Sequence, residues 1–465
     1  MAGHHVTAVE EPSEAAPRTA PRTAPRTAPA FVLLGAVQVC LIFTLAAIAV
    51  PLPRIGREFA LDRADLILLT AAYGLTFAGL LLFGGRVADR WGGRRALTAG
   101  LLLFGAASAL APAAQGHAVL LAARFAQGAG AALVAPAAVA VLRTVFPDPA
   151  AYGRAMAAWG GLSVLGATAG NLLSGVVSTL WSWRLTLALP LAVAALALAL
   201  APRLLPPTAP GAGRALDLPG ALLATGGLLG AGYGLVMADA YGLTAPHVLV
   251  PLGVGAALLA GFVAVERRAP DPLLPPGFLR AGRRAPGLAA IAMTAAGTAT
   301  VFVILSLHLQ HDRGWSPLRT SAAFVPFAVA LLTAGRLAGP LIGRYGAARV
   351  TGAGLGSGAV GLALLAATGL APGVPYGYGL LPGLVLLPVG AALSFAGAAV
   401  LAMESVAPTD VGLAGGVMNT AMEFGPTILF AALLTVGGDP STLFAAAVLS
   451  AALAVHLSTR ATRAV

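Results

Sequence analysis

Gly84-Gly-Arg-Val-Ala-Asp-Arg-Trp-Gly-Gly-Arg-Arg95 follows one long apolar segment of this chain, and Gly339-Pro-Leu-Ile-Gly-Arg-Tyr-Gly-Ala-Ala-Arg349 follows another. When Arg90 is aligned with Arg344, both stretches read Arg-aromatic-Gly-small and end in arginine. Internal symmetry of this kind is expected when two halves of a membrane protein are related by a pseudo-twofold axis. The repeat therefore predicts two similar helical halves, each with a tight, charged glycine turn. The alternative is that both stretches only set the topology of the chain.

The composition is that of a polytopic membrane protein. Of 465 residues, 58% are hydrophobic and 10% charged, whereas a soluble domain is about 25% charged. The chain contains no lysine, which excludes a Walker A lysine for ATP and a Schiff-base lysine. The single cysteine, Cys40, excludes disulfides and cysteine-rich metal sites. We therefore expect no metal site, no cofactor and no enzymatic activity.

Apolar stretches of about 20 residues recur from Phe31 onward, and each is long enough to cross a hydrocarbon core of about 30 Å as a helix. An even number of spans places both termini on one side of the membrane. We expect fourteen spans, at residues 31–51, 65–84, 96–114, 118–142, 155–177, 184–201, 218–238, 247–265, 286–308, 320–341, 350–369, 377–402, 412–435 and 440–459.

The arginines indicate which side is cytoplasmic. With the N-terminal tail inside, 21 of the 28 arginines lie in inner segments or toward the inner ends of spans, six lie in outer segments or at outer ends, and Arg124 is the one assigned to the interior of a span. This bias predicts that both termini are cytoplasmic. The net charge of +11 then lies on the inner face, where it meets anionic lipid, and it is not a nucleic-acid footprint. Residues 1–30 carry three Pro-Arg-Thr-Ala repeats and are expected to be a disordered cytoplasmic tail.

Five motifs together resemble the major facilitator superfamily, and specifically its fourteen-span drug:proton antiporters. The first is the conformational-switch loop of that superfamily, with matching residues Gly85, Asp89, Arg90, Gly92, Arg94 and Arg95. The others are Ala123-Arg-Phe-Ala-Gln-Gly-Ala-Gly-Ala-Ala132, Trp181-Ser-Trp-Arg184, Phe262-Val-Ala-Val-Glu-Arg-Arg268 with Pro272-Leu-Leu274, and Gly412-Leu-Ala-Gly-Gly-Val-Met-Asn419.

The resemblance implies an all-α membrane protein with the major facilitator fold and fourteen transmembrane helices. Six-helix bundles are expected at residues 31–201 and 286–465, with two inserted helices in the linker 202–285. The implied function is proton-coupled efflux of a small amphipathic drug or antibiotic-like compound by alternating access, driven by the proton motive force. The protein would be a monomer in the inner (plasma) membrane. An uptake permease or facilitator of the same fold is the alternative, and a receptor or membrane enzyme is a third class.

The sequence departs from the family at two places. In span 1 the family carries an acidic residue where this chain has Thr44, nine positions before Pro53. In span 5 the antiporter motif has proline and glycine where this chain has Asn171 and Ser174. These departures leave the fold expectation unchanged. The altered span 5 motif weakens the antiport inference and is the feature that favours the permease alternative.

Glu423 and Arg124 are the two ionisable residues expected at membrane depth, where charges are costly and functional by default. A carboxyl removed from water favours its protonated form, so Glu423 is the candidate proton carrier or cation-binding group. Its alternative is a structural hydrogen bond between helices. The resemblance implicates Arg124 in proton coupling, and the alternative is an arginine that snorkels to the outer interface.

Other polar, aromatic and methionine side chains within the spans are candidates for a substrate cavity, because such surfaces adapt to hydrophobic ligands of varied shape. Each taken singly is also compatible with a lipid-facing or core position. The candidates are Gln38, Tyr73, Gln127, Trp159, Asn171, Tyr233, Phe302, Asn419 and Met422.

Overall fold

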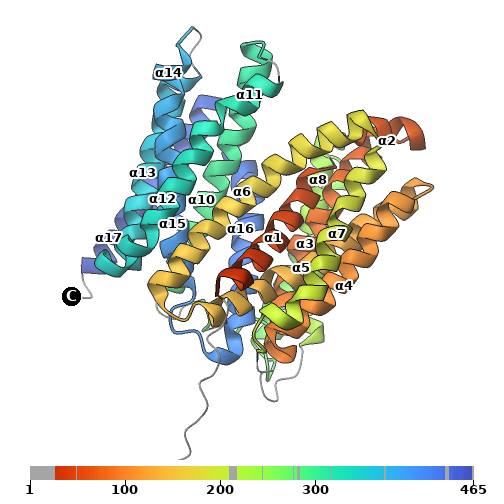
Figure 1. Cartoon of the computed structure of the whole chain (residues 1–465), viewed down its shortest axis with the longest axis horizontal. Coiled ribbons are helices and arrows are strands. Elements are labelled where there is room, and N and C mark those ends of the chain that lie inside the picture. Colours follow the sequence, from red (N-terminus) through yellow and green to blue (C-terminus); the bar gives the residue numbers. More distant parts are fainter. Residues whose placement is uncertain are drawn as a thin grey trace, which may run out of the picture.

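The computed structural model describes residues 27–462 apart from residues 49, 209–216, 243, 276, 280–282, 316, 371–372 and 435–438, and all regular secondary structure in this part of the chain is helical (Figure 1). The long helices are α1 (Thr27–Ala46), α3 (Arg63–Trp91), α4 (Gly93–Leu110), α5 (His117–Val145), α6 (Pro149–Leu180), α7 (Trp183–Leu204), α8 (Leu218–Tyr241), α9 (Pro246–Glu266), α10 (Arg284–Leu307), α12 (Val325–Tyr345), α13 (Ala347–Leu364), α15 (Leu381–Ala402), α16 (Val411–Leu434) and α17 (Asp439–Thr462). The short helices are α2 (Leu52–Phe59), α11 (Pro317–Ala323) and α14 (Tyr376–Gly379).

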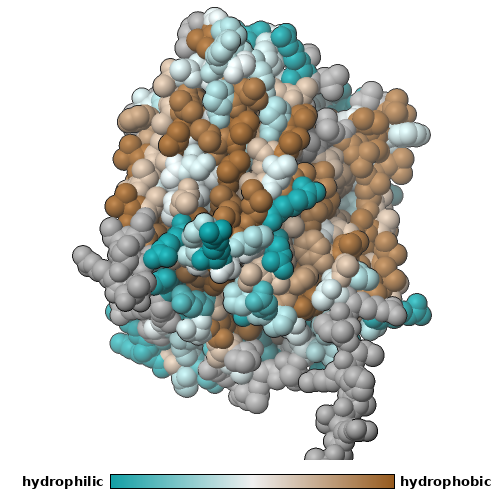
Figure 2. Space-filling model, turned by 60° about the vertical axis from the view of Figure 1, so that its left-hand side comes forward, coloured by the Kyte–Doolittle hydropathy of each residue, from teal (hydrophilic) through white to brown (hydrophobic). Residues whose placement is uncertain are grey.

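Twelve helices within the described residues are long and apolar enough, by length and composition, to cross a membrane. The other two long helices, α6 with 32 residues and α16 with 24, cover the predicted spans 155–177 and 412–435. Hydrophobic residues cover most of the upper part of the face in Figure 2, with hydrophilic residues gathered below them. The predicted all-helical, multi-pass class is confirmed, with twelve candidate spans.

The two charged repeats are mostly helical, which corrects the expectation of loops at Gly84–Arg95 and Gly339–Arg349. Helix α3 continues to Trp91 and α12 continues to Tyr345. Only Gly92 and Gly346 form the turns, and their φ angles of 84° and 82° lie in the region that favours glycine. The helices extend beyond the apolar segments. In α3 this extension is stabilised because its polar residues find hydrogen-bond partners beyond the apolar segment.

Helix pairing recurs along the chain. Helix α5 packs against α3 and α4, α1 packs against α6, and α4 packs against α7. In the later part of the chain, α15 packs against α12 and α13, α10 against α16, and α13 against α17. The pairs of helices in contact in the first part of the chain therefore correspond to the pairs in the later part, as the repeated sequence predicts.

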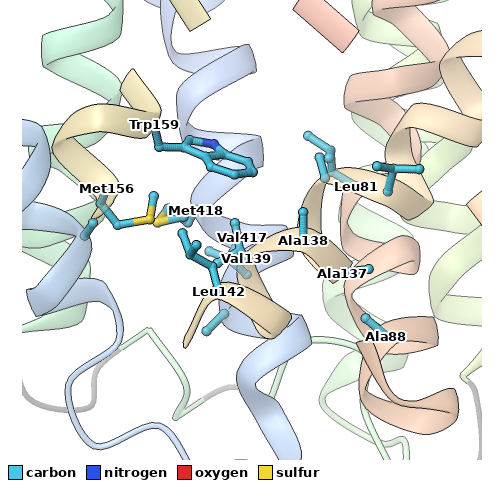
Figure 3. Close-up of a cluster of buried hydrophobic side chains, with 14 of the residues drawn as sticks. Leu81, Ala88, Ala137, Ala138, Val139, Leu142, Met156, Trp159, Val417 and Met418 are labelled. Carbon is cyan, nitrogen blue, oxygen red and sulfur yellow. The ribbon is translucent and has the colours of Figure 1, made fainter. Parts of the chain in front are cut away.

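Two helices carry most of the contact between these groups. Helix α6 packs against α12 and α15, while α16 packs against α3 and α5, and both run between the groups in Figure 1. Figure 3 shows Met156 of α6 pointing toward Met418 of α16 beside the Trp159 ring, within a core cluster that also contains Leu142 of α5. Burial of these large apolar side chains stabilises the contact between the two groups of helices.

The helices α8 and α9 pack against each other, and α8 also packs against α3. Asp217 caps α8, since its side chain accepts a hydrogen bond of 2.9 Å from the backbone N–H of Gly220. The inserted pair therefore lies beside the first group of helices rather than within it.

Helix α2 lies at the end of the molecule opposite the Gly92 turn and was not expected from the sequence. It buries Ile55 against the core. Its Glu58 accepts a hydrogen bond from the Trp183 indole nitrogen at 2.8 Å and pairs with Arg184 at 2.7 Å. The hydrogen bonds from Arg184 and Trp183 lower the pKa of Glu58 below its usual value. The Trp181–Arg184 motif thus attaches α2 to the start of α7.

Candidate functional site

Arg124 lies in α5 with none of its surface exposed. Its Nη1 donates to the backbone carbonyl of Thr44 at 2.9 Å and to Oε1 of Gln127 at 3.2 Å. Gln127 in turn donates from Nε2 to Oγ of Ser108 at 3.0 Å. The guanidinium carbon lies 5.0 Å from the centroid of the Tyr73 ring, a cation–π distance. A buried polar cluster therefore joins α1, α3, α4 and α5, and Arg124 does not snorkel in this conformation.

Close packing of α3 on α5 holds this cluster together. A Cβ atom at Gly128 would collide with the backbone oxygen of Tyr73 and the hydroxyl of Thr76. The Thr76 hydroxyl donates to the backbone carbonyl of Phe125 at 2.9 Å. Glycine at this position lets the two backbones approach, which brings Tyr73 over the guanidinium.

Glu423 lies on α16, which packs against α3, the helix that carries Tyr73. It is partly buried on α16, and Tyr73 lies within electrostatic reach of both Glu423 and Arg124. One turn earlier on α16, Asn419 is 2% exposed and donates from Nδ2 to the carbonyl of Gly415 at 2.8 Å. The structure thus brings the two predicted ionisable residues toward one aromatic ring.

Several predicted cavity residues are closed off from solvent in this conformation. Gln38 donates from Nε2 to Oγ of Ser163 at 3.0 Å and joins α1 to α6. Trp159 lies in the core cluster of Figure 3, against which Met422 also packs. Tyr73 and Gln127 belong to the polar cluster around Arg124, whereas Asn419 lies on α16, which packs against α3 and α5.

Two other predicted cavity residues are not brought to this cluster. Phe302 of α10 stacks on Phe324 at 4.4 Å between ring centroids, within a separate core cluster of the later helices. Tyr233 lies on α8, which packs against α3 and α9. The side chain of Asn171 lies outside the described residues.

A second polar site joins the C-terminal end of α3 to the start of α16, where the predicted switch loop lies. The two carboxylate oxygens of Asp89 accept from the backbone N–H groups of Gly412 and Leu413 at 2.5 and 2.7 Å. A carboxylate at a helix N-terminus satisfies free N–H groups and complements the helix dipole. A Cβ at Gly85 would lie only 2.6 Å from the carbonyl oxygen of Gly412. We call this contact of Gly85 and Asp89 with α16 the latch.

The remaining switch residues lie around the Gly92 turn. The backbone N–H of Arg94 donates to Oγ1 of Thr208 at 3.0 Å, and its side chain donates to the carbonyl of Leu205 at 3.2 Å. Arg90 and Arg95 are exposed. The turn is therefore tied to the segment that follows α7.

The family comparison decides the identity of the chain. The family model described as Major Facilitator Superfamily matches residues 32–428. The chain belongs to the Major Facilitator Superfamily. Among the relatives within it, the cephamycin export protein CmcT of Amycolatopsis lactamdurans is 37% identical over 416 residues, covering 88% of this chain and 85% of that protein. The puromycin resistance protein pur8 of Streptomyces alboniger is 35% identical, covering 88% and 82%.

Solved structures of the Major Facilitator Superfamily share the fold. The human organic anion transporter MFSD10 (TETRAN) has a TM-score of 0.67 at 18% identity, covering 93% of this chain and all of that one. The proton:xylose symporter XylE has a TM-score of 0.65 at 14% identity, covering 93% and 95%. As a Major Facilitator Superfamily member, the chain is a multi-pass membrane protein.

Arg86 is a residue of this Major Facilitator Superfamily site that sequence reasoning missed. Its Nη1 pairs with Asp410 at 3.1 Å, just before the helix that Asp89 caps. Its Nε and Nη2 donate to the carbonyls of Leu273 and Pro272 at 2.7 and 2.6 Å. Glu266 fixes the same linker by accepting from the backbone N–H of Leu273 at 3.0 Å. The available signal was that Arg86 lies one turn from Asp89 within the repeated motif.

Proposed function

We propose that the chain exports small amphipathic, antibiotic-like compounds in exchange for protons, as a fourteen-span drug:proton antiporter. Relatives of similar length carry names for cephamycin export and puromycin resistance. The helices α6 and α16 supply the two spans beyond the twelve found by length and composition, since they carry the contact between the helix groups. Both termini are cytoplasmic in this proposal, as the arginine bias predicts.

The observation that carries the proton coupling is that Arg124 lies over the Tyr73 ring while Glu423, on α16 of the other helix group, is within electrostatic reach of the same ring. Glu423 takes up a proton from the outer side and releases it inside, with Arg124 as the fixed charge that senses its state. Substrate binds between the groups near Trp159 and Asn419. The units 31–201 and 286–465 then rock about α6 and α16.

The latch and the apolar cluster of Figure 3 close the cytoplasmic side in this mechanism. Opening that side requires Asp89 to release the N-terminus of α16 and Met156 to separate from Met418. Proton uptake by Glu423 biases this equilibrium through its differential affinity for the two states. No cofactor takes part, and the proton motive force drives the cycle in a monomer.

The test of export is accumulation of a cephamycin and of puromycin in cells that lack their own efflux pumps. Expression of the chain lowers the steady-state level of at least one compound, and a protonophore restores it. An unchanged level with the protein verified in the membrane contradicts export. Raised uptake that ignores the protonophore supports the facilitator, which Asn171 favours at the sequence level.

A further inference from the structure

The guanidinium of Arg124 is only partly satisfied within the described part of the chain. Nη1 makes both of its hydrogen bonds, to the carbonyl of Thr44 and to Gln127. Nε and Nη2 have no acceptor and are shielded from solvent. A buried donor without an acceptor is destabilising, and more so when it is charged. Such a group calls for a partner that is absent from this state.

Among the described side chains, no carboxylate forms an ion pair with Arg124. The groups that face it are the Thr44 carbonyl of α1, the Tyr73 ring of α3 and the Gln127 amide of its own helix. None of these groups is a carboxylate. Arg86 and Arg184, by contrast, each pair with an acidic side chain. Removing one partner of a buried pair leaves a strongly unfavourable charge, so a mobile anion is the natural complement.

The two nitrogens without acceptors lie on the same edge of the planar guanidinium. Their N–H bonds run parallel and match the two oxygens of one carboxylate, the bidentate geometry that arginine favours. We propose that this edge of Arg124 binds a carboxylate group of the transported compound. The structure thereby assigns a substrate class: amphipathic organic acids, held by Arg124 with their apolar part toward the interface of the two helix groups.

This inference rests on the proposed function, because the Arg124 edge is closed here and is reached only when the helix groups rearrange. It goes beyond proton coupling, since it makes Arg124 a determinant of substrate specificity. Neutral analogues of the same shape carry no negative charge to pair with Nε and Nη2 of Arg124. They bind poorly because the guanidinium would stay buried and without a counter-charge.

The probe pair is benzoate and benzamide, which share a shape and differ in charge. Thermal unfolding of the purified full chain in nanodiscs is measured with each compound at equal ionic strength. Ligand binding to the folded state raises the midpoint, and we expect benzoate to raise it by about 2–4 °C while benzamide has no effect. Arg124→Gln removes the benzoate shift. The matched control Arg184→Gln retains it, because Arg184 already has Glu58 as its partner.

A second variant pair covers the case in which Arg124→Gln does not fold. Thr44→Asp places a carboxylate on the α1 residue that Arg124 contacts, so it supplies the missing charge and removes the benzoate shift. Thr44→Asn has the same shape without the charge and retains the shift. Equal shifts with benzoate and benzamide, no shift with either, or a benzoate shift that survives Thr44→Asp would each overturn the proposal.

The same preparation separates this proposal from the proposed function. Drug-dependent proton flux without benzoate protection contradicts the carboxylate site and leaves antiport standing. Benzoate protection that depends on Arg124, without any drug-dependent proton flux, supports the site and contradicts antiport.

Discussion

At the scale of single residues, a series of buried side-chain hydrogen bonds holds the region around Arg124 in place. Gln127 accepts from Arg124 with its oxygen and donates to Ser108 with its nitrogen, so its orientation is fixed from both ends. The Ser108 hydroxyl then donates to the carbonyl of Phe104 at 2.7 Å. Each hydrogen bond orients the next group along the chain, and the loss of one member leaves the atom that it paired with unsatisfied.

Ser108→Ala tests this chain of hydrogen bonds. The substitution removes the acceptor of the Gln127 amide in a site without solvent, so we expect a stability loss of about 1–3 kcal/mol, seen as a lower midpoint of thermal unfolding. Thr98→Ala is the matched control, because the Thr98 hydroxyl bonds only the Arg94 carbonyl of its own helix. Equal midpoints for the two variants would show that Ser108 does not anchor Gln127.

At the scale of elements, the N-termini of the corresponding helices α6 and α16 are capped in different ways. Helix α6 is capped by its own Asp148, which accepts from the backbone N–H of Ala151 at 2.7 Å. Helix α16 is capped instead by Asp89 of α3, from the other helix group. The position aligned with Asp89 in the second repeat is Gly343, which has no carboxylate. The latch is therefore present in the first repeat alone, and it ties two groups rather than one helix.

Asp89→Asn and Gly85→Ala are expected to weaken the latch by different means. The first removes the charge at the N-terminus of α16, and the second places a Cβ 2.6 Å from the Gly412 oxygen. Spin labels at Thr144 and Thr409, both exposed, report the separation of the two groups at this end. We expect a larger population of long distances in both variants. Distance distributions in both variants that are identical to those of the wild-type chain would contradict a role of the latch in holding the two groups together.

The contact of α2 with α7 predicts a pH dependence of stability. Because hydrogen bonds from Arg184 and Trp183 lower the pKa of Glu58 in the folded state, the contribution is present above the unfolded value of about 4.3. It is lost as the pH falls through the lower folded value. Glu58→Gln should lower the unfolding midpoint slightly at pH 7, since the pair is partly exposed. The difference from wild type should vanish in acid, and a constant difference would contradict the pairing.

The chain's sequence predicts the whole-molecule architecture well, because that architecture follows from local properties. Apolar length predicted the helices, and the repeated Gly92 and Gly346 positions predicted the turns. The contacts of Arg86 with Pro272 and Leu273 were not predictable, since they join segments about 186 residues apart. The short helix α2 was missed as well, because its burial of Ile55 depends on tertiary packing.

Alternating access requires the whole molecule to exchange one closed interface for another. In the present state Met156, Trp159 and Met418 pack together, and the latch holds the same side of the helix groups. Arg86 extends this closure to the linker after α9. The segment after α9 is thereby tied to the closed state by hydrogen bonds from the Arg86 side chain to backbone carbonyls, in addition to the core contacts that α8 and α9 make.

Drug-driven proton movement through Glu423 is tested most directly in inverted membrane vesicles that hold a preformed pH gradient. Addition of a cephamycin or puromycin should dissipate the gradient in vesicles with the wild-type chain, and Glu423→Gln should reduce that rate at least tenfold. Glu404→Gln, at an exposed position beyond α15, should leave the rate unchanged. Drug accumulation that is indifferent to the gradient, or full proton coupling in Glu423→Gln, would contradict the account.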